Sequence, residues 1–390
     1  FLHLPELTDA EIAVLGQMRS SLNEQIEQAG GALPFDRYME SALYAPGLGY
    51  YVNGRRKFGE AGDFVTSPEV SPLFSRCLAR QVSECLNKLG GGSVLEVGAG
   101  SGRMAADVLA ELEALGAVPD RYQILELSPS LQQTQYDTLK LSTPHLLARV
   151  EWLTGLPDAG FRGVLLGNEL LDAMPVHRFR RAGDRWQELS VAVEGEGFRD
   201  HWAEMKSPGL AQALADIWPD SAEVDDGYSS EVNMRLGPWL QAVSGILHAG
   251  YLILVDYGYT RREYYHPERR QGTLMCHFRH RAYADPYLLP GLQDITANVD
   301  FTALARASVK LGFEVSGYTT QAHFLIDSGL EQMLSVSDPT DVQRHMQLMQ
   351  GVKKLTLPGE MGERFKVMAL ARSVPAELSG FRSRDMRERL

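Results

Sequence analysis

The sequence predicts an α/β protein built around a mainly parallel sheet, and three observations lead to that fold class. Residues 93–115 follow the pattern strand, glycine turn, helix. Apolar runs of strand length then alternate with helical patterns over much of the remaining chain, as repeated βαβ units do. Acidic side chains stand directly after several predicted strands, at the edge where open α/β sheets bind their ligands.

Residues 1–90 are predicted to form a helical and glycine-rich loop region that covers the ligand site. The loop over 44–69 combines glycines with aromatic side chains. We expect its Thr66 and Ser67 to line a wall of the site, and the alternative is a plain surface connector with buried anchors. Helical spacing of apolar residues predicts helices over 8–28, from residue 34 and over 71–89.

The glycine turn that follows the first strand of the sheet indicates the class of cofactor. A dinucleotide fingerprint has the spacing G-x-G-x-x-G, but here Arg103 occupies the position of the third glycine. The spacing G-x-G-x-G is instead typical of S-adenosylmethionine (SAM) methyltransferases, because the missing Cβ atoms let the methionine end of SAM touch backbone. Another nucleotide or a structural turn are the alternatives. The predicted SAM contacts here are Glu96, Gly98, Ala99, Gly100, Ser101 and Gly102, and Ser101 is also the expected N-cap of the helix.

A second acid follows the next predicted strand. Glu126 stands 28 positions after Gly98, whereas about 20 positions separate the corresponding groups of a dinucleotide site. Glycine turn, helix, strand and acid therefore follow in the expected order, and the segment between the turn and the acid is somewhat longer than in a dinucleotide site. We expect Glu126 to accept hydrogen bonds from the ribose hydroxyls, and we assign the adjacent Leu127 to the same cofactor site.

Three further acids are predicted to be catalytic. The fourth predicted strand ends at Asn168 and Glu169, and Asp172 follows three residues later. Asp256 ends the fifth strand. Side chains at these strand ends face the ligand crevice, so Asn168 and Glu169 are also assigned to cofactor binding. The alternatives are a helix-start acid for Glu169 and a capping role for Asp172.

A sheet domain over 91–372 is predicted to carry two insertions and to be followed by a tail over 373–390. The first insertion, at about 176–228, has three alternating segments that indicate an antiparallel meander. The second, at about 259–297, holds a cluster of arginines and histidines, which is either a solvated loop or a surface for a partner. Outside the insertions we expect a helix over 229–248, strands over 313–319 and 365–372, and helices over 321–329 and 339–355.

Composition and charge narrow the class of protein. Lys and Arg number 38 against 50 Asp and Glu, a net charge of −12, which disfavours nucleic acid as a partner. The three cysteines form no CxxC pair and predict a reducing compartment. No apolar run reaches the length of a membrane helix. The histidines lack the spacing of metal ligands, so no metal site is expected.

Several longer motifs occur in one order along the chain. They are Gly49-Tyr50-Tyr51, Gly62-Asp63-Phe64-x-Thr66-Ser67-Pro68-Glu69, Leu95 to Gly102 and Asn168-Glu169-Leu170-Leu171-Asp172-Ala173-Met174-Pro175-Val176. With these motifs the sequence resembles the MidA/NDUFAF7 family of SAM-dependent methyltransferases, and the likeness extends over nearly the whole chain.

This resemblance implies a class I methyltransferase fold, a Rossmann-like seven-stranded sheet with helices on both faces and an antiparallel last strand. It also implies arginine methylation of a protein, a subunit of respiratory complex I in the mitochondrial members. In a bacterium the chain would act in the cytoplasm, and in a eukaryote in the mitochondrial matrix. Glu169, with Asp172 or Asp256, would then orient the guanidinium through paired hydrogen bonds.

Three other functions remain open from the sequence. One is a methyltransferase that acts on a small molecule or RNA. Another is an assembly factor that binds SAM without turnover. The third, an NAD-dependent oxidoreductase, is disfavoured by Arg103.

Overall fold

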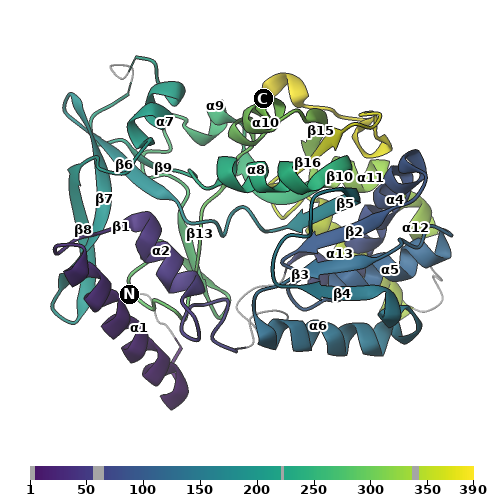
Figure 1. The fold of residues 1–390 in the computed structure, drawn as a ribbon, viewed down its shortest axis with the longest axis horizontal. Coiled ribbons are helices and arrows are strands. Elements are labelled where there is room, and N and C mark those ends of the chain that lie inside the picture. The colour runs from purple at the N-terminus through teal and green to yellow at the C-terminus, as the bar shows by residue number, and fades with distance from the viewer. Residues whose placement is uncertain (1–4, 56–65, 221–223, 336–341) are drawn as a thin grey trace. The chain divides into compact units, whose positions relative to one another are not determined.

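The computed structural model describes residues 5–55, 66–220, 224–335 and 342–390 (Figure 1). Contacts divide the chain into two compact units. The meander unit comprises Phe1–Phe64, Asp172–Pro238 and Arg261–Asn298, and the sheet unit comprises Val65–Leu171, Trp239–Thr260 and Val299–Leu390. The meander unit thus combines N-terminal residues with both predicted insertions, whereas residues 65–90 fall in the sheet unit. Residues 56–65 of the predicted loop over 44–69 lie outside the described residues.

The sheet unit is built on a mixed sheet. Its strand order is β15-β16-β10-β5-β2-β3-β4, and the short β14 pairs with the end of β10, which gives eight strands within the described residues. Strand β16 is antiparallel to both neighbours, and the pairs among β10, β5, β2, β3 and β4 are parallel. The strands are β2 (Ser93–Val97), β3 (Tyr122–Leu125), β4 (Val150–Leu153), β5 (Phe161–Asn168), β10 (Leu247–Tyr259), β14 (Val299–Asp300), β15 (Glu314–Thr320) and β16 (Phe365–Arg372). The predicted seven strands and the antiparallel last strand are confirmed, and β14 is an addition.

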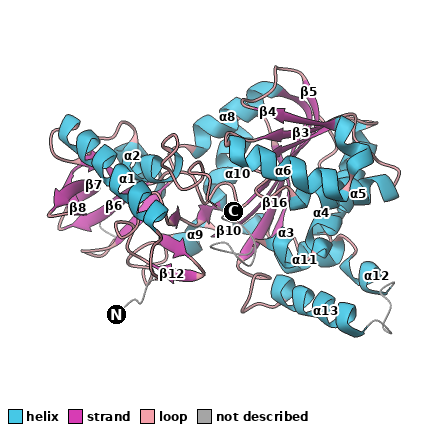
Figure 2. Ribbon diagram, turned by 90° about the horizontal axis from the view of Figure 1, so that it is seen from below, coloured by secondary structure: helices cyan, strands magenta, loops and turns pink. Residues whose placement is uncertain are grey.

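Helices cover both faces of this sheet. Val94 and Leu95 point to opposite faces of β2, and both are buried, as expected when each face carries helices. In Figures 1 and 2, α8 lies on one side of β3, β4 and β5, and α6 lies on the other. The helices are α3 (Ser67–Val70), α4 (Pro72–Leu89), α5 (Arg103–Ala114), α6 (Pro129–Ser142), α8 (Leu236–Ile246), α10 (Phe301–Lys310), α11 (Gln321–Asp327), α12 (Leu330–Ser335) and α13 (Val342–Thr356).

The meander unit contains two smaller sheets. One has the order β1-β7-β6-β9 with β8 paired to β7, and the other has the order β12-β11-β13. The predicted antiparallel meander corresponds to β6, β7 and β8. The elements are α1 (Asp9–Gln28), β1 (Leu33–Pro34), α2 (Phe35–Tyr44), β6 (His177–Ala182), β7 (Arg185–Glu194), β8 (Gly197–Glu204), α7 (Leu210–Ile217), β9 (Ser229–Val232), α9 (Arg261–Tyr264), β11 (Met275–Phe278), β12 (Arg281–Tyr283) and β13 (Asp294–Thr296).

Three local predictions were wrong. The helix expected over 229–248 begins only at Leu236, because residues 229–232 pair with β6 as strand β9. The N-cap of α5 is Gly102, not Ser101, and the Ser101 hydroxyl instead accepts a hydrogen bond from Arg103 N at 3.3 Å. The helix expected over 321–329 ends at Asp327, where Ser328 caps it, and α12 follows.

The basic segment at 259–297 is more ordered than a solvated loop. It contributes β11, β12 and β13, and several of its arginines contact their own unit. Arg270 Nη1 donates to Asp225 at 2.8 Å, and Arg279 Nη2 donates to both carboxylate oxygens of Glu11 at 2.9 and 2.8 Å. Some arginines of this basic segment therefore form ion pairs within the meander unit. Among the described helices none is both long and apolar enough to cross a membrane.

Candidate cofactor and acceptor site

The parallel register brings the ends of four strands to one edge of the sheet. Val97 of β2 lies beside Leu125 of β3 and Gly167 of β5, and Asn168 of β5 lies beside Val255 of β10. The glycine turn, Glu126, Glu169 and Asp256 follow or end these strands. They therefore share the carboxyl edge of the sheet, as the sequence predicts for a ligand site.

The glycine turn between β2 and α5 is left-handed at each of its glycines. Gly98, Gly100 and Gly102 have φ values of 71°, 53° and 81°, which other residues adopt only with strain. Gly102 has a second constraint, because a Cβ atom there would lie 2.8 Å from the Cα atom of Gln135. A Cβ atom on Gly98 would meet only Leu170 Cδ1, at 3.7 Å. The turn therefore packs tightly on α6 at Gly102 but can be approached closely at Gly98.

Glu96 lies just before the turn and is 1% exposed. Burial raises the pKa of Glu96 to about 7, although a hydrogen bond from Tyr122 opposes the shift and the neighbouring Glu126 adds to it. Tyr122 Oη donates to Glu96 Oε2 at 2.5 Å. Within the described residues, Glu96 Oε1 has no hydrogen-bond partner. This buried oxygen is chemically suited to accept a donor from the methionine end of SAM.

Glu126 follows β3 and is held by two donors. Ser128 N donates to its Oε1 at 2.9 Å, and Gln135 Nε2 donates to its Oε2 at 3.0 Å. These contacts fix the orientation of the carboxylate at the carboxyl edge of the sheet. The adjacent Leu127 is 68% exposed, and that apolar surface is suited to an adenine ring.

Glu169 follows β5 in a conformation that is unusual for a glutamate. Its φ is 50°, and left-handed residues other than glycine are often found at functional sites. Its backbone N–H donates to Val255 O of β10 at 2.8 Å. Its Oε1 accepts from Asn168 Nδ2 at 3.3 Å and from Ser67 N of α3 at 3.4 Å. Strand β5 and helix α3 thus hold the carboxylate, and β10 holds the backbone of the same residue.

Asp256 supports the same turn from the neighbouring strand. It is buried, and its Oδ2 accepts from Leu170 N at 3.1 Å and Leu171 N at 2.9 Å. Its Oδ1 accepts from Tyr257 N at 2.9 Å. Backbone donors therefore engage both oxygens, which is the pattern of a residue that fixes a loop.

Other predicted site residues lie in different surroundings. Asp172 is buried in the meander unit, and its carbonyl accepts from Ala297 N at 3.0 Å. Thr66 is the N-cap residue of α3. The buried Ser67 hydroxyl donates to Gln321 Oε1 at 3.0 Å, so its backbone N–H is the group directed at Glu169. Ser101 Oγ donates to Glu69 Oε1, and Ala99 is buried within the turn.

Sequence reasoning missed Gln135. This residue lies in the middle of α6 and is buried, with Leu139 one turn further along the same face. Its side chain contacts both Glu126 and Gly100 O. The available signal was a polar residue at a core-facing position of a helix, which a search for apolar periodicity passes over.

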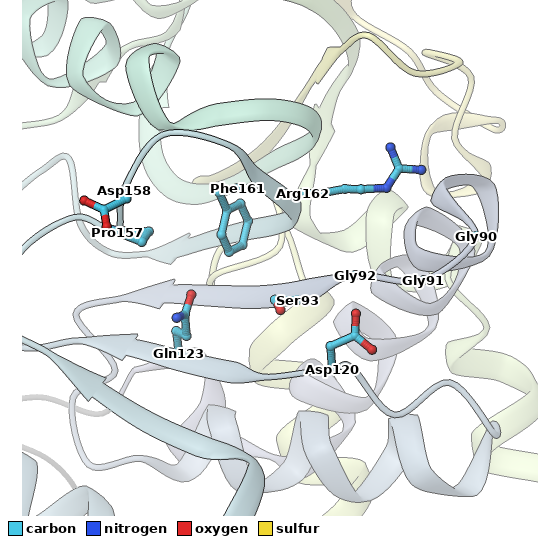
Figure 3. A pocket seen from close by; sticks show the side chains of 10 residues that line it. All are labelled: Gly90, Gly91, Gly92, Ser93, Asp120, Gln123, Pro157, Asp158, Phe161 and Arg162. Carbon is cyan, nitrogen blue, oxygen red and sulfur yellow. The ribbon is translucent and has the colours of Figure 1, made fainter.

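A hollow of about 580 Å³ lies at the opposite edge of the sheet (Figure 3). Gly92, Ser93 and Phe161 line it near the amino ends of β2 and β5, and Arg162 and Asp120 stand at its sides. None of the predicted site residues lies there. Within the described residues, no group of three or more His, Cys, Asp or Glu side chains is close enough to hold a metal ion.

Both the sequence and the fold are similar to those of known proteins. The sequence model of a family described as "Putative S-adenosyl-L-methionine-dependent methyltransferase" matches residues 77–319. The fold is similar to that of a COG1565 superfamily member from Burkholderia thailandensis bound to S-adenosyl-homocysteine, with a TM-score of 0.95, 42% identity and coverage of 100% of both chains.

Two curated relatives are similar over most of their length. The mitochondrial protein arginine methyltransferase NDUFAF7 homolog of Caenorhabditis elegans is 29% identical, with 88% of this chain and 84% of the relative covered. The mitochondrial protein arginine methyltransferase NDUFAF7 of Rattus norvegicus is 29% identical, with 87% and 81% covered.

Proposed function

This chain belongs to the MidA/NDUFAF7 family of SAM-dependent methyltransferases, and we propose that it transfers the methyl group of SAM to an arginine side chain of a protein. Its cofactor is SAM, and the chemistry is a displacement at the sulfonium methyl group. Because SAM is already activated, the protein's main contributions are alignment and exclusion of water.

The placement of Glu169 carries the proposal. A guanidinium stays protonated and shares its lone pairs over three nitrogens, so an acceptor arginine has to be oriented by a carboxylate. Glu169 offers one at the carboxyl edge, and its neighbour Leu170 lies against the glycine turn. Asn168 Oδ1 is buried without a hydrogen-bond partner in the described structure and is suited to accept from a second guanidinium N–H.

For the cofactor, we propose that Glu126 binds the ribose and that Leu127 packs on the adenine. Gly98, Ala99 and Gly100 would receive the methionine end, with Glu96 beneath them. Asp256 then has a different role from the catalytic one predicted from sequence. Its contacts support a positioning role, in which it holds the turn that carries Glu169.

Replacing Glu126 by alanine should weaken SAH binding about 10- to 100-fold, since hydrogen bonds to a charged group contribute roughly 1.5–3 kcal/mol. Turnover at saturating SAM should stay within about threefold of wild type if the loss concerns binding alone. Isothermal titration with SAH and the SAM dependence of the rate measure the two effects. Glu113→Ala, at an exposed position of α5, is the matched control, and unchanged SAH affinity in Glu126→Ala would remove Glu126 from the site.

Replacing Asp256 by asparagine should reduce transfer about 10- to 100-fold while SAH affinity changes less than about threefold. Asparagine has only one acceptor oxygen, so its NH₂ group has to face either Leu170 N and Leu171 N or Tyr257 N. One of these contacts becomes a donor–donor contact and the backbone shifts, and displacements of about 1 Å can reduce rates about 100-fold. The double variant Asp256→Asn/Glu169→Gln should be no slower than Glu169→Gln, because both changes act through one carboxylate. A fully additive loss in the double variant would instead give Asp256 its own catalytic contribution.

The function itself is tested by incubating the purified protein with methyl-labelled SAM and separate protein, RNA and metabolite fractions. Label in the protein fraction, located on arginine by mass spectrometry, is the expected result. The family resemblance makes subunits of respiratory complex I the first purified acceptors to test. Label in RNA or metabolites would overturn the proposed acceptor. Binding of SAH without transfer to any fraction would favour an assembly factor that has no turnover.

We further propose that the protein works in a reducing compartment, the cytoplasm of a bacterium or the mitochondrial matrix of a eukaryote. Cys77, Cys85 and Cys276 are buried free thiols. Burial raises the pKa of Cys77 to about 12, which keeps that thiol protonated and unreactive.

A further inference from the structure

We propose that Gln135 is a positioning residue that couples the glycine turn to the ribose-binding carboxylate and so sets the protein's preference for an intact ribose. The inference rests on the proposed role of Glu126. It adds a residue that contacts neither the ribose nor the transferred methyl group.

The Gln135 side chain joins two parts of the proposed cofactor site to the neighbouring strand β4. Its Nε2 group donates to Glu126 Oε2 at 3.0 Å and to Gly100 O at 3.1 Å. Its Oε1 accepts from Trp152 Nε1 of β4 at 3.0 Å. Both amide protons and the amide oxygen are thus engaged, and the residue is 0% exposed.

The backbone of the same helix rests directly on the turn. A Cβ atom at Gly102 would come within 2.8 Å of Gln135 Cα, and Thr138 Oγ1, one turn of α6 further on, donates to Ser101 O at 2.8 Å. Helix α6 cannot move relative to the glycine turn without breaking these contacts. The turn, Glu126 and Trp152 are therefore held as one assembly around the Gln135 amide.

The hydrogen bonds of the Gln135 amide contribute more than the volume that the side chain fills. A buried amide is unfavourable unless its hydrogen bonds are made, and a methionine would fill a similar volume without any of them. The Nε2 group has to present two donors, one to a carboxylate and one to a carbonyl. Only in that orientation does the Glu126 carboxylate keep a fixed plane toward the sugar. Loss of the amide should therefore affect recognition of the ribose hydroxyls more than packing.

The first test is Gln135→Met, titrated with SAH and with its 2′-deoxyribose analogue. We expect SAH affinity to fall about 10-fold and affinity for the analogue to change little, so that the preference for SAH is lost. The rate at saturating SAM should stay within about twofold. Gln133→Met, an exposed position of the same helix, is the control and should bind both ligands as the wild type does.

A second variant keeps the inference testable if the methionine disturbs folding. In Gln135→Glu, two carboxyl groups lie about 3 Å apart, and one of them stays protonated at low pH. That protonated group can donate to Glu126, but it has one proton where the amide has two, so the hydrogen bond to Gly100 O is lost at either pH. SAH affinity relative to wild type at the same pH should therefore be at least about 10-fold weaker at pH 8.5 than at pH 6.

The outcomes separate the inference from its premise. If Glu126→Ala binds SAH as the wild type does, the role of Glu126 in the proposed function fails. If Glu126→Ala loses affinity but Gln135→Met keeps both affinity and preference, the inference on Gln135 alone is overturned. The inference is also overturned if Gln135→Met weakens the affinity for SAH and for the analogue equally and the SAH affinity of Gln135→Glu does not change with pH. Gln135 would then have a structural role only.

Discussion

Replacing Glu169 by glutamine should nearly abolish methyl transfer while SAH affinity stays within about twofold of wild type. Glutamine keeps the size of the side chain and one acceptor oxygen, but it removes the negative charge that holds a guanidinium. Loss of a preorganised charged contact to the reacting group typically lowers the rate 10²- to 10³-fold. Initial rates of SAH formation with the acceptor, together with titration of SAH, measure the two quantities.

The control for this variant is Glu331→Gln, at an exposed position of α12, which should leave the rate unchanged. Glu169→Asp should be intermediate, because it retains the charge but withdraws it from Ser67 N and Asn168 Nδ2. A rate within twofold of wild type in Glu169→Gln would remove Glu169 from the mechanism. A parallel loss of SAH affinity would instead make Glu169 part of the cofactor site.

The sequence predicted the carboxyl edge because the relevant signals are local. The spacing of Gly98, Gly100 and Gly102 and the strand ahead of Glu126 lie within about 30 residues. Parallel strands also direct their carboxyl ends to one edge. Knowledge of which strands pair was not needed to place these groups together, and the fold class followed from the same alternation.

The backbone contacts of Asp256 could not be predicted in the same way. Its position at a strand end is equally compatible with catalysis and with holding a loop. The difference depends on where Leu170 N and Leu171 N point, and that follows from the left-handed φ of Glu169. A residue with a Cβ gives no sequence signal for that conformation, unlike a glycine.

Long-range pairing explains the other differences. Residues 229–232 continue the helical pattern of α8, but β6 offers them strand partners, and that pairing overrides the local preference. Gln135 was missed because a search for apolar residues at helical spacing does not count a glutamine, even where it is buried. Its importance becomes visible only when Glu126, Gly100 and Trp152, which are distant in sequence from one another, are found around it.

Replacing Glu96 by glutamine should stabilise the protein without cofactor at pH 8 by up to about 3 kcal/mol, and much less at pH 4.5. Burial raises the pKa of Glu96 from 4.5 to about 7. Between these values the native state binds more protons than the unfolded state, so the free energy of unfolding falls as pH rises through this window. A neutral glutamine removes that loss, and its amide oxygen can still accept from Tyr122 Oη.

Urea unfolding of wild type and Glu96→Gln at pH 4.5 and pH 8, with Glu314→Gln at an exposed position of β15 as the control, measures the difference. A stability gain of equal size at both pH values would contradict the proposed origin of the effect in a buried charge. Saturating SAH provides a further readout. The positively charged amino group of the ligand favours an ionised carboxylate beneath the glycine turn, so the gain should shrink when SAH is bound. The ionised Glu96 carboxylate would then destabilise the protein without cofactor and be stabilised by the amino group of the bound ligand.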